Sequence, residues 1–280
     1  MAPVRLIVFD LDGTLLGEGN RLSWRTVSVL ERAKAKGLIL MAASGRSRWA
    51  ADMVLQPTTA IDYMICSNGA LLYDRSNRKI VHRRTLTPRR VGQLFAIVDE
   101  FFKDACWAWE TEEGIVPDRR FRSLGTRLGR RLDELDASPY LELPDDPSVP
   151  IEQRLAGFGR IVRGLLAHPK LTPEEIVLRL KGRVPARLSS STAIFLEVTA
   201  PEVHKGAMLR AFCARADISS DEVVAFGDHL NDLTMLRWAG RGIAMKGAYQ
   251  GVLDRVAERT DETNVQDGVA LAIEKLLADR

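Results

Sequence analysis

The sequence predicts an α/β protein with a doubly wound parallel sheet and a second, inserted module of α+β type. Short apolar runs alternate with helical patterns up to about residue 83 and again after residue 201, as in a parallel sheet covered by helices on both faces. Between these parts a run of arginines is followed by a run of acids. We therefore expect a core of residues 1–83 and 199–280, and an inserted domain of residues 84–198.

The first part of the core begins with the apolar run Leu6–Phe9, which predicts a buried strand. Residues 22–36 carry apolar side chains at helical spacing and end before Gly37, so they predict a helix. The next segments continue this alternation: strand 38–42, helix 47–55, strand 61–66, and hairpin strands 71–73 and 79–82. This order is typical of a Rossmann-like sheet.

The inserted part has no such regular alternation. Its pattern predicts helices and strands in mixed order: helices 88–103, 151–166 and 173–181, and strands 106–109, 114–116, 186–189 and 193–198. After Pro201 the parallel pattern resumes: helices 205–214, 231–238 and 267–277, and strands 223–226 and 242–245.

Composition and charge exclude several classes of protein. The net charge of +3 is too small to indicate binding to nucleic acid or to a membrane surface. No apolar run approaches the roughly 20 residues of a membrane helix. Cys66, Cys106 and Cys213 are odd in number and far apart, which indicates reduced thiols. We expect a cytoplasmic monomer or homodimer with no nucleic-acid or membrane partner.

Two carboxylates, Asp10 and Asp12, directly follow the first predicted strand, and Gly13 then allows a sharp turn. Chemistry in an open parallel sheet collects beyond the carboxyl ends of its strands. Two acids this close repel each other unless a cation or a proton offsets their charge, and Mg2+ is a natural partner for such oxygen ligands. Taken alone, however, Asp-x-Asp-Gly is more typical of a solvated turn.

Three further segments stand at comparable positions in the predicted sheet. Ser44 follows the second strand, Lys205 begins a helix, and residues 227–232 (Gly-Asp-His-Leu-Asn-Asp) follow the strand at 223–226. Together with Asp10 and Asp12 they supply a carboxylate nucleophile, a second carboxylate, a hydroxyl donor, a cation and further acids. This inventory suits phosphoryl transfer. Individually, each is also typical of a turn, a helix cap or a surface charge.

The same four segments carry a family resemblance. Phe9-Asp10-Leu11-Asp12-Gly13-Thr14-Leu15 resembles the first motif of the haloacid dehalogenase superfamily of phosphohydrolases. Ser44-Gly45-Arg46 is similar to its second motif, Lys205-Gly206 to its third, and residues 227–232 to its fourth. The long gap between the second and third motifs resembles that of the Cof-type branch, which inserts its larger α/β cap (C2B type) there. Ser67-Asn68-Gly69-Ala70 and Asp267-Gly268-Val269-Ala270 also resemble that branch.

The resemblance implies a catalytic role for four residues. Asp10 would be the nucleophile that becomes an aspartyl phosphate, and Asp12 would act first as general acid and then as general base. Ser44 and the backbone amide of Gly45 would donate hydrogen bonds to the phosphate. Lys205 would neutralise both the phosphoryl group and the Asp10 carboxylate.

The resemblance also implies a metal site. Asp228 would ligate Mg2+, together with a side-chain oxygen of Asp10 and the backbone carbonyl of Asp12. Asp232 would hold the waters of the metal or orient Lys205. Asn231, between these two acids, would help to position the phosphate.

The inserted domain has no recognisable motif, so its role in substrate choice stays open. Trp107 and Trp109 lie on one face of a predicted strand, where they could stack on a sugar or base or belong to the core of the domain. The six arginines between Arg119 and Arg131 could steer an anionic substrate or pair with the acids that follow them.

We therefore expect a Mg2+-dependent phosphatase acting on a small phosphomonoester, such as a sugar phosphate or a related phosphorylated metabolite. A phosphomutase on the same core is an alternative, and so is a binding or regulatory protein without turnover. Haloalkanoic acid dehalogenation fits less well, because a halide leaving group requires neither an acid such as Asp12 nor a metal.

Overall fold

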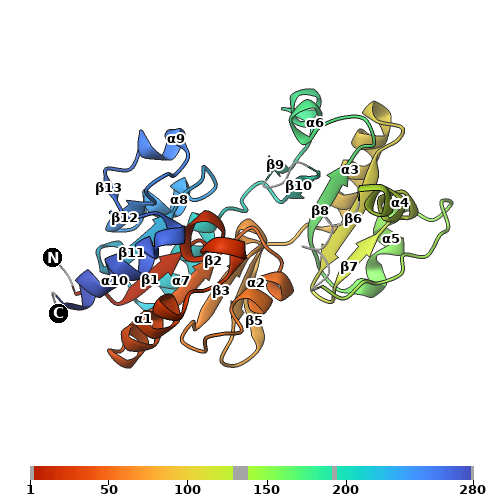
Figure 1. Cartoon of the computed structure of the whole chain (residues 1–280). Coiled ribbons are helices and arrows are strands. Elements are labelled where there is room, and N and C mark those ends of the chain that lie inside the picture. Colours follow the sequence, from red (N-terminus) through yellow and green to blue (C-terminus); the bar gives the residue numbers. More distant parts are fainter. Residues whose placement is uncertain (1–2, 129–137, 191–193, 279–280) are drawn as a thin grey trace. The chain divides into compact units, whose positions relative to one another are not determined.

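A computed structural model describes residues 3–128, 138–190 and 194–278 of the chain (Figure 1). The chain divides into two compact units. The first consists of Met1–Arg83 and His204–Arg280, and the second, Arg84–Val203, is inserted between these segments. Each unit contains one sheet.

The sheet of the first unit has the strand order β13-β12-β11-β1-β2-β3-β4-β5. Neighbours from β13 to β3 are parallel, whereas β4 and β5 are antiparallel and form the hairpin at one edge. The strands are β1 (Leu6–Phe9), β2 (Ile39–Ala43), β3 (Tyr63–Cys66), β4 (Leu71–Asp74), β5 (Lys79–Arg83), β11 (Val223–Gly227), β12 (Arg241–Ala244) and β13 (Glu258–Arg259).

The register of the central strands places the ends of three strands side by side. Phe9, the last residue of β1, lies opposite Phe226 of β11 and Ala42 of β2. All four side chains of β1 are fully buried, because helices cover both faces of a doubly wound sheet. The residues that follow these strands therefore leave the sheet together at the carboxyl ends of the strands, where the polar residues Asp10, Ser44 and Asp228 occur.

Helices complete the first unit. They are α1 (Trp24–Ala35), α2 (Arg48–Val54), α7 (Lys205–Ala216), α8 (Leu233–Leu236), α9 (Gln250–Leu253) and α10 (Gly268–Ala278). The hydroxyl of Ser23 accepts a hydrogen bond from the backbone of Thr26 and so caps α1. Helix α1 packs against α10, and α7 packs against α8 and β3 (Figure 1). The predicted doubly wound α/β core is confirmed.

The second unit has a five-stranded sheet in the order β7-β6-β8-β10-β9, with all neighbours antiparallel. Its strands are β6 (Cys106–Thr111), β7 (Ile115–Pro117), β8 (Ile161–Ala167), β9 (Arg187–Ser189) and β10 (Leu196–Thr199). Its helices are α3 (Pro88–Phe101), α4 (Arg119–Leu128), α5 (Ile151–Arg154) and α6 (Pro173–Leu180). Phe121 of α4 packs on Ala108 and Leu165 of the sheet.

A charged cluster is buried in this second sheet. Arg163 of β8 lies between Glu110 of β6 and Glu197 of β10, at distances of 2.6 Å (Nε to Oε2) and 2.5 Å (Nη1 to Oε1). Arg163 is 3% exposed and the two glutamates are buried. Buried charges are tolerated only when they are paired in this way.

One predicted helix is wrong. Residues 151–166 form only the short helix α5, a turn and then the strand β8. Gly159 has a φ of +75° and ends any helical path, and β8 is buried on both faces, so its apolar run resembles a buried helix. Helices α4 and α9 and the short strand β13 were not predicted. Residues 130–131 of the arginine run, 132–137 of the acidic run and residue 193 of a predicted strand lie outside the described residues.

Two further expectations concern cysteines and membranes. Cys66, Cys106 and Cys213 are all buried free thiols, as predicted. Among the described helices, none has the length and apolar character needed to cross a membrane.

Candidate active site

Four predicted site residues from three segments lie together at the carboxyl ends of the central strands of the first sheet. Asp10 follows β1, Lys205 is the first residue of α7, and Asp228 and Asp232 follow β11. Lys205 and Asp232 are fully buried, and Asp10 is 6% exposed. Residues separated by about 200 positions in the chain thus share one small polar cluster within an apolar core.

The turn after β1 depends on Gly13. Residues Leu11–Leu15 form a single wide helical turn, which Leu15 closes by donating its backbone N–H to the carbonyl of Asp10. Gly13 has a φ of +76°, and a Cβ atom there would lie 2.5 Å from Oδ2 of Asp228. Only glycine satisfies both constraints, so the turn can bring the backbone of residues 12–13 close to Asp228.

Lys205 binds two carboxylates. Its Nζ atom lies 2.5 Å from Oδ1 of Asp10 and 2.6 Å from Oδ1 of Asp232. Since ion pairs this deeply buried are poorly screened by water, the ammonium group fixes both acids at a defined position. The N-cap of this helix is His204, whose Nδ1 atom accepts a hydrogen bond from the backbone of Ala207.

Burial and neighbouring charges shift the pKa values of this cluster. Burial raises the pKa of Asp10 well above its ordinary value; Lys205 opposes this rise, and Asp232 and Asp228 add to it. Burial also raises the pKa of Asp228, again with a contribution from Asp232. Burial would lower the pKa of Lys205, but Asp10 and Asp232 outweigh it and raise that pKa. The site therefore holds more negative charge than its one lysine neutralises.

Three of the four predicted metal residues form a cluster that suits a hard cation. One carboxylate oxygen from each of Asp10, Asp228 and Asp232 lies within 4.8 Å of the other two. An excess of carboxylate oxygens is the donor set that Mg2+ prefers. The second oxygen of Asp232 accepts hydrogen bonds from the backbone N–H groups of Asp228 and His229, both at 3.0 Å. Asp232 is thus already engaged on both oxygens, and Asp10 and Asp228 are better placed as direct ligands.

The fourth predicted metal residue, Asp12, places its side chain elsewhere. Arg46 binds both of its carboxylate oxygens, Nε to Oδ2 at 2.9 Å and Nη2 to Oδ1 at 2.6 Å. The Asp12 side chain is 46% exposed, unlike the buried carboxylates of the cluster. Its side chain thus lies at the surface in a pair with Arg46, and the backbone carbonyl of Asp12, which the resemblance implied as the ligand, stays the candidate for the metal.

Ser44 and Gly45 lie in the turn after β2, and Asn231 lies in the loop after β11. Ser44 is 1% exposed, and its hydroxyl oxygen accepts a hydrogen bond from the backbone of Arg46 at 3.1 Å. The backbone carbonyl of Ser44 accepts from the backbone N–H of Asn68 at 3.0 Å. Asn231 donates a hydrogen bond from Nδ2 to Oδ1 of Asn68 at 3.0 Å. Asn68 therefore links the turn after β2 to the loop after β11.

The structure brings three residues into this site that had no predicted role. Arg46 holds Asp12, Asn68 holds Asn231, and the hydroxyl of Thr14 donates to Oδ1 of Asp228 at 3.0 Å. Each lies within a segment that carries the family resemblance, and that position was the available signal. Their partners lie far away in the chain, so only the fold identifies them.

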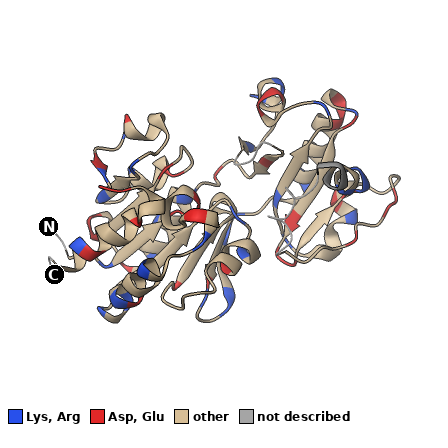
Figure 2. Cartoon of the chain, in the orientation of Figure 1, with Lys and Arg blue, Asp and Glu red and all other residues tan. Residues whose placement is uncertain are grey.

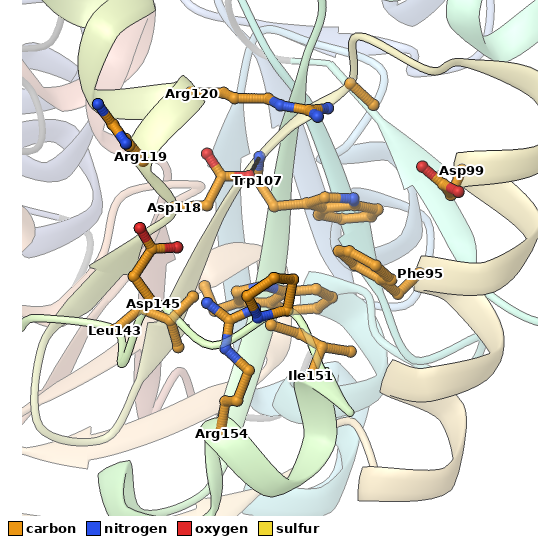
Figure 3. Close-up of a pocket in the computed structure, with 13 residues that line it drawn as sticks. Phe95, Asp99, Trp107, Asp118, Arg119, Arg120, Leu143, Asp145, Ile151 and Arg154 are labelled. Carbon is orange, nitrogen blue, oxygen red and sulfur yellow. Dashed lines mark hydrogen bonds between the residues drawn. The ribbon is translucent and has the colours of Figure 1, made fainter. Parts of the chain in front are cut away.

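In the second unit, the two tryptophans pack on each other. The rings of Trp107 and Trp109 are 4.6 Å apart and nearly parallel, with an interplanar angle of 9°. Both side chains are at most 2% exposed. Together with Phe95 and Ile151 they line a cavity of about 200 Å³ (Figure 3). Burial and mutual stacking are typical of core side chains, and both rings also border this cavity.

The arginine run begins at Arg119, and those of its arginines that the structure describes lie on α4, where Figure 2 shows basic residues in blue. Arg122 pairs with Glu142 at 3.6 Å, and Arg120 donates to the backbone carbonyl of Lys103 at 2.7 Å. One arginine thus pairs with the acidic stretch that follows. Arg119 and Arg120 also border the cavity beside Asp118 (Figure 3).

The chain matches a known protein family along most of its length. Residues 7–273 match the family model of the haloacid dehalogenase-like hydrolases. Two Bacillus subtilis relatives are the phosphatase YwpJ, 25% identical over 98% of this chain and 100% of its own, and the 5-amino-6-(5-phospho-D-ribitylamino)uracil phosphatase YcsE, 24% identical over 96% and 94%. The HMP-PP phosphatase of Enterobacter sp. is 28% identical over 87% of this chain and 85% of its own.

Solved structures share the fold. A haloacid dehalogenase-like hydrolase from Bacteroides thetaiotaomicron superposes with a TM-score of 0.79 at 24% identity, over 98% of this chain and 99% of its own. A protein described as a subclass IIB sugar phosphatase of the same superfamily gives a TM-score of 0.75 at 23% identity, over 97% and 98%. These matches span both units of the chain.

Proposed function

Since the chain belongs to the haloacid dehalogenase-like hydrolases, we propose that it is a Mg2+-dependent phosphatase that hydrolyses a small phosphomonoester through an aspartyl-phosphate intermediate. The observation that carries the proposal is the contact of Lys205 with both Asp10 and Asp232, beside the carboxylate of Asp228. A buried, charge-compensated carboxylate at the end of β1 is what a nucleophile in phosphoryl transfer requires.

Asp10 attacks phosphorus in the proposed first step. Lys205 contacts Oδ1 of Asp10 and so holds the carboxylate in a fixed position for the attack. The bond from phosphorus to the leaving oxygen breaks as the bond to Asp10 forms, so the phosphoryl group is carried by the enzyme. Water then attacks the same phosphorus atom, which releases inorganic phosphate and restores the Asp10 carboxylate.

Asp12 transfers the protons of both steps. It gives a proton to the departing alkoxide and later takes one from the attacking water. Its partial exposure places it on the solvent side of the cluster, where a leaving group would depart. Arg46 fixes the carboxylate of Asp12 through two hydrogen bonds and so restricts its orientation.

The phosphate oxygens are bound by donors from three segments. The hydroxyl of Ser44 and the backbone N–H of Gly45 come from the turn after β2, Lys205 comes from α7, and Asn231 comes from the loop after β11. Lys205 acts as a fixed point charge, while the neutral donors set the orientation of the phosphoryl group.

Asp10, Asp228 and the backbone carbonyl of Asp12 would hold Mg2+, with Asp232 orienting Lys205. When bound, the cation would neutralise charge on the phosphoryl group and on the carboxylates around it. Burial, with the neighbouring acids adding to it, raises the pKa values of Asp10 and Asp228, so a bound cation would favour their ionised forms.

The proposed substrate is a sugar phosphate or a related phosphorylated metabolite. The relatives named above act on a phosphorylated ribitylaminouracil and on HMP-PP, and one structural neighbour is a sugar phosphatase. In this proposal the inserted unit selects the leaving group, the protein works in the cytoplasm as a monomer or homodimer, and it needs no nucleic-acid or membrane partner.

Hydrolysis of an aryl phosphate with Mg2+ or with EDTA tests this proposal, followed by a panel of phosphorylated sugars and cofactor precursors. Phosphate release should require Mg2+ and should disappear in Asp10→Asn. A phosphomutase would instead return the phosphoryl group to a second hydroxyl of the substrate, and a silent binding protein would release no phosphate. Activity that survives Asp10→Asn or EDTA would overturn the mechanism.

A further inference from the structure

The turn that follows β3 has an unusual backbone. Ser67, Asn68 and Gly69 all have positive φ values, +50°, +57° and +109°. Positive φ is uncommon for residues other than glycine and costs energy unless the surroundings enforce it. Ser67 is fully buried and Asn68 is 7% exposed, so this turn is not a solvated loop.

The backbone of this turn contacts two of the four motif segments. Ser67 donates its N–H to the carbonyl of Arg46 at 2.8 Å, and Asn68 donates its N–H to the carbonyl of Ser44 at 3.0 Å. A Cβ atom on Gly69 would lie 2.6 Å from the carbonyl carbon of His204 and 3.1 Å from the backbone nitrogen of Lys205. The turn at residues 67–69 therefore packs directly against the Ser44–Gly45 turn and against the start of α7.

The side chain of Asn68 reaches a third motif segment. Its Oδ1 atom accepts the hydrogen bond from Nδ2 of Asn231, and its Nδ2 atom lies 3.3 Å from the position that a Cβ atom of Gly45 would occupy. The other amide atom of Asn231, Oδ1, is buried with no hydrogen-bond partner among the described residues. One buried amide thus spans the distance between the Ser44–Gly45 turn and the loop that carries Asp228 and Asp232.

We propose that Asn68 is a positioning residue for the phosphoryl group, an inference that rests on the proposed phosphatase function. Asn68 fixes Asn231 and the Ser44–Gly45 turn relative to each other, so that their donors converge on one set of phosphate oxygens. The left-handed backbone at Asn68 directs the amide into this gap. Asn68 acts through these neighbours and needs no contact with the reacting atoms.

Asn68→Gly tests this role with little disturbance of the backbone, because glycine adopts positive φ at no steric cost. We expect kcat/KM for an aryl phosphate to fall about tenfold or more, and the inhibition constant of inorganic phosphate to rise, while Tm changes little. Asn20→Gly is the matched control, because Asn20 also has a positive φ (+56°) but is exposed. It should leave kcat/KM unchanged.

A double-mutant cycle with Asn231→Ala separates positioning from a merely structural role. If Asn68 acts through Asn231, the double variant should lose little more activity than the worse single variant. Fully additive losses, or an Asn68→Gly variant with wild-type kcat/KM and phosphate inhibition, would overturn this inference alone. A wild-type protein that releases no phosphate from any substrate in the presence of Mg2+ would overturn the proposed function and this inference with it.

Discussion

Arg46 donates hydrogen bonds to both carboxylate oxygens of Asp12, from Nε to Oδ2 at 2.9 Å and from Nη2 to Oδ1 at 2.6 Å. The guanidinium group is largely buried, with 12% of its side chain exposed, whereas 46% of the Asp12 side chain is exposed. A planar fork on two oxygens fixes the plane of the carboxylate, which a single charge cannot do. In the proposed mechanism this fixed plane directs the proton of Asp12 toward the leaving group.

Arg46→Lys keeps the charge but loses the fork. We expect kcat to fall about tenfold for an alkyl phosphate, whose leaving group needs a proton, and by less than about threefold for a nitrophenyl phosphate, whose leaving group does not. Steady-state kinetics with the two substrates measure the difference. Arg241→Lys, which alters a surface pair with Glu258, is the control and should have no effect. Equal losses on both substrates would show that Arg46 does not act through protonation of the leaving group.

Thr14→Val removes the hydroxyl that binds Asp228 but keeps the shape of a side chain that is 1% exposed. The unrestrained carboxylate should bind Mg2+ less well, and outer hydrogen bonds of this kind are worth roughly tenfold or more in metal affinity. We expect the Mg2+ concentration for half-maximal activity to rise about tenfold, with a smaller change in kcat at saturating Mg2+. An unchanged Mg2+ dependence would show that Thr14 does not support the metal site.

Stability should depend on pH and Mg2+ together. The raised pKa values of Asp10 and Asp228 mean that folding favours their protonated forms in the metal-free protein. This contribution to stability is present below about pH 4 and is lost as the pH rises through the folded-state pKa values. Mg2+ binds the deprotonated forms, so its stabilising effect should grow over the same rise in pH.

We therefore expect the difference in Tm between protein in Mg2+ and protein in EDTA to widen as the pH rises above about 4. Thermal melts at a series of pH values measure this difference. Asp228→Asn should reduce the difference at every pH, because it removes a proposed ligand. A difference that stays constant, or that is largest at acid pH, would contradict the assignment of these two acids to the metal.

The buried cluster of the second unit gives a prediction about stability. Arg163→Met would leave Glu110 and Glu197 buried without their cation, so the free energy of unfolding should fall by about 3–5 kcal/mol. Arg241→Met breaks only a surface pair and should cost less than about 1 kcal/mol. Urea denaturation compares the two variants. A loss below about 1 kcal/mol for Arg163→Met would show that the cluster stabilises little.

Local sequence signals were sufficient for the first sheet except for its short strand β13. The strand Leu6–Phe9 and the helix that begins at Lys205 were predicted from their apolar spacing and their neighbouring polar residues, and the structure confirms both. The strand β8 was missed because a strand buried on both faces has no alternation to distinguish it from a helix. Its identity depends on pairing with β6 and β10, which no local pattern contains.

The same limit applies to the site. Motif residues such as Asp10 and Lys205 could be named from sequence, and the structure brings them within 2.5 Å of each other. Arg46, Asn68 and Thr14 could not be given roles, because a role for each depends on a partner 34, 163 or 214 positions away. The structure also places the side chain of Asp12 on Arg46 and apart from the other acids, which the Asp-x-Asp spacing alone does not predict.

Mass spectrometry of acid-quenched protein tests whether Asp10 is the nucleophile. The protein would be mixed with Mg2+ and a substrate that it hydrolyses, quenched during turnover and digested. We expect a phosphoryl group on the peptide that contains Asp10, more of it in Asp12→Asn because breakdown of the intermediate slows, and none in Asp10→Asn. Phosphate release by an enzyme whose phosphoryl adduct lies on another residue would show that Asp10 is not the nucleophile.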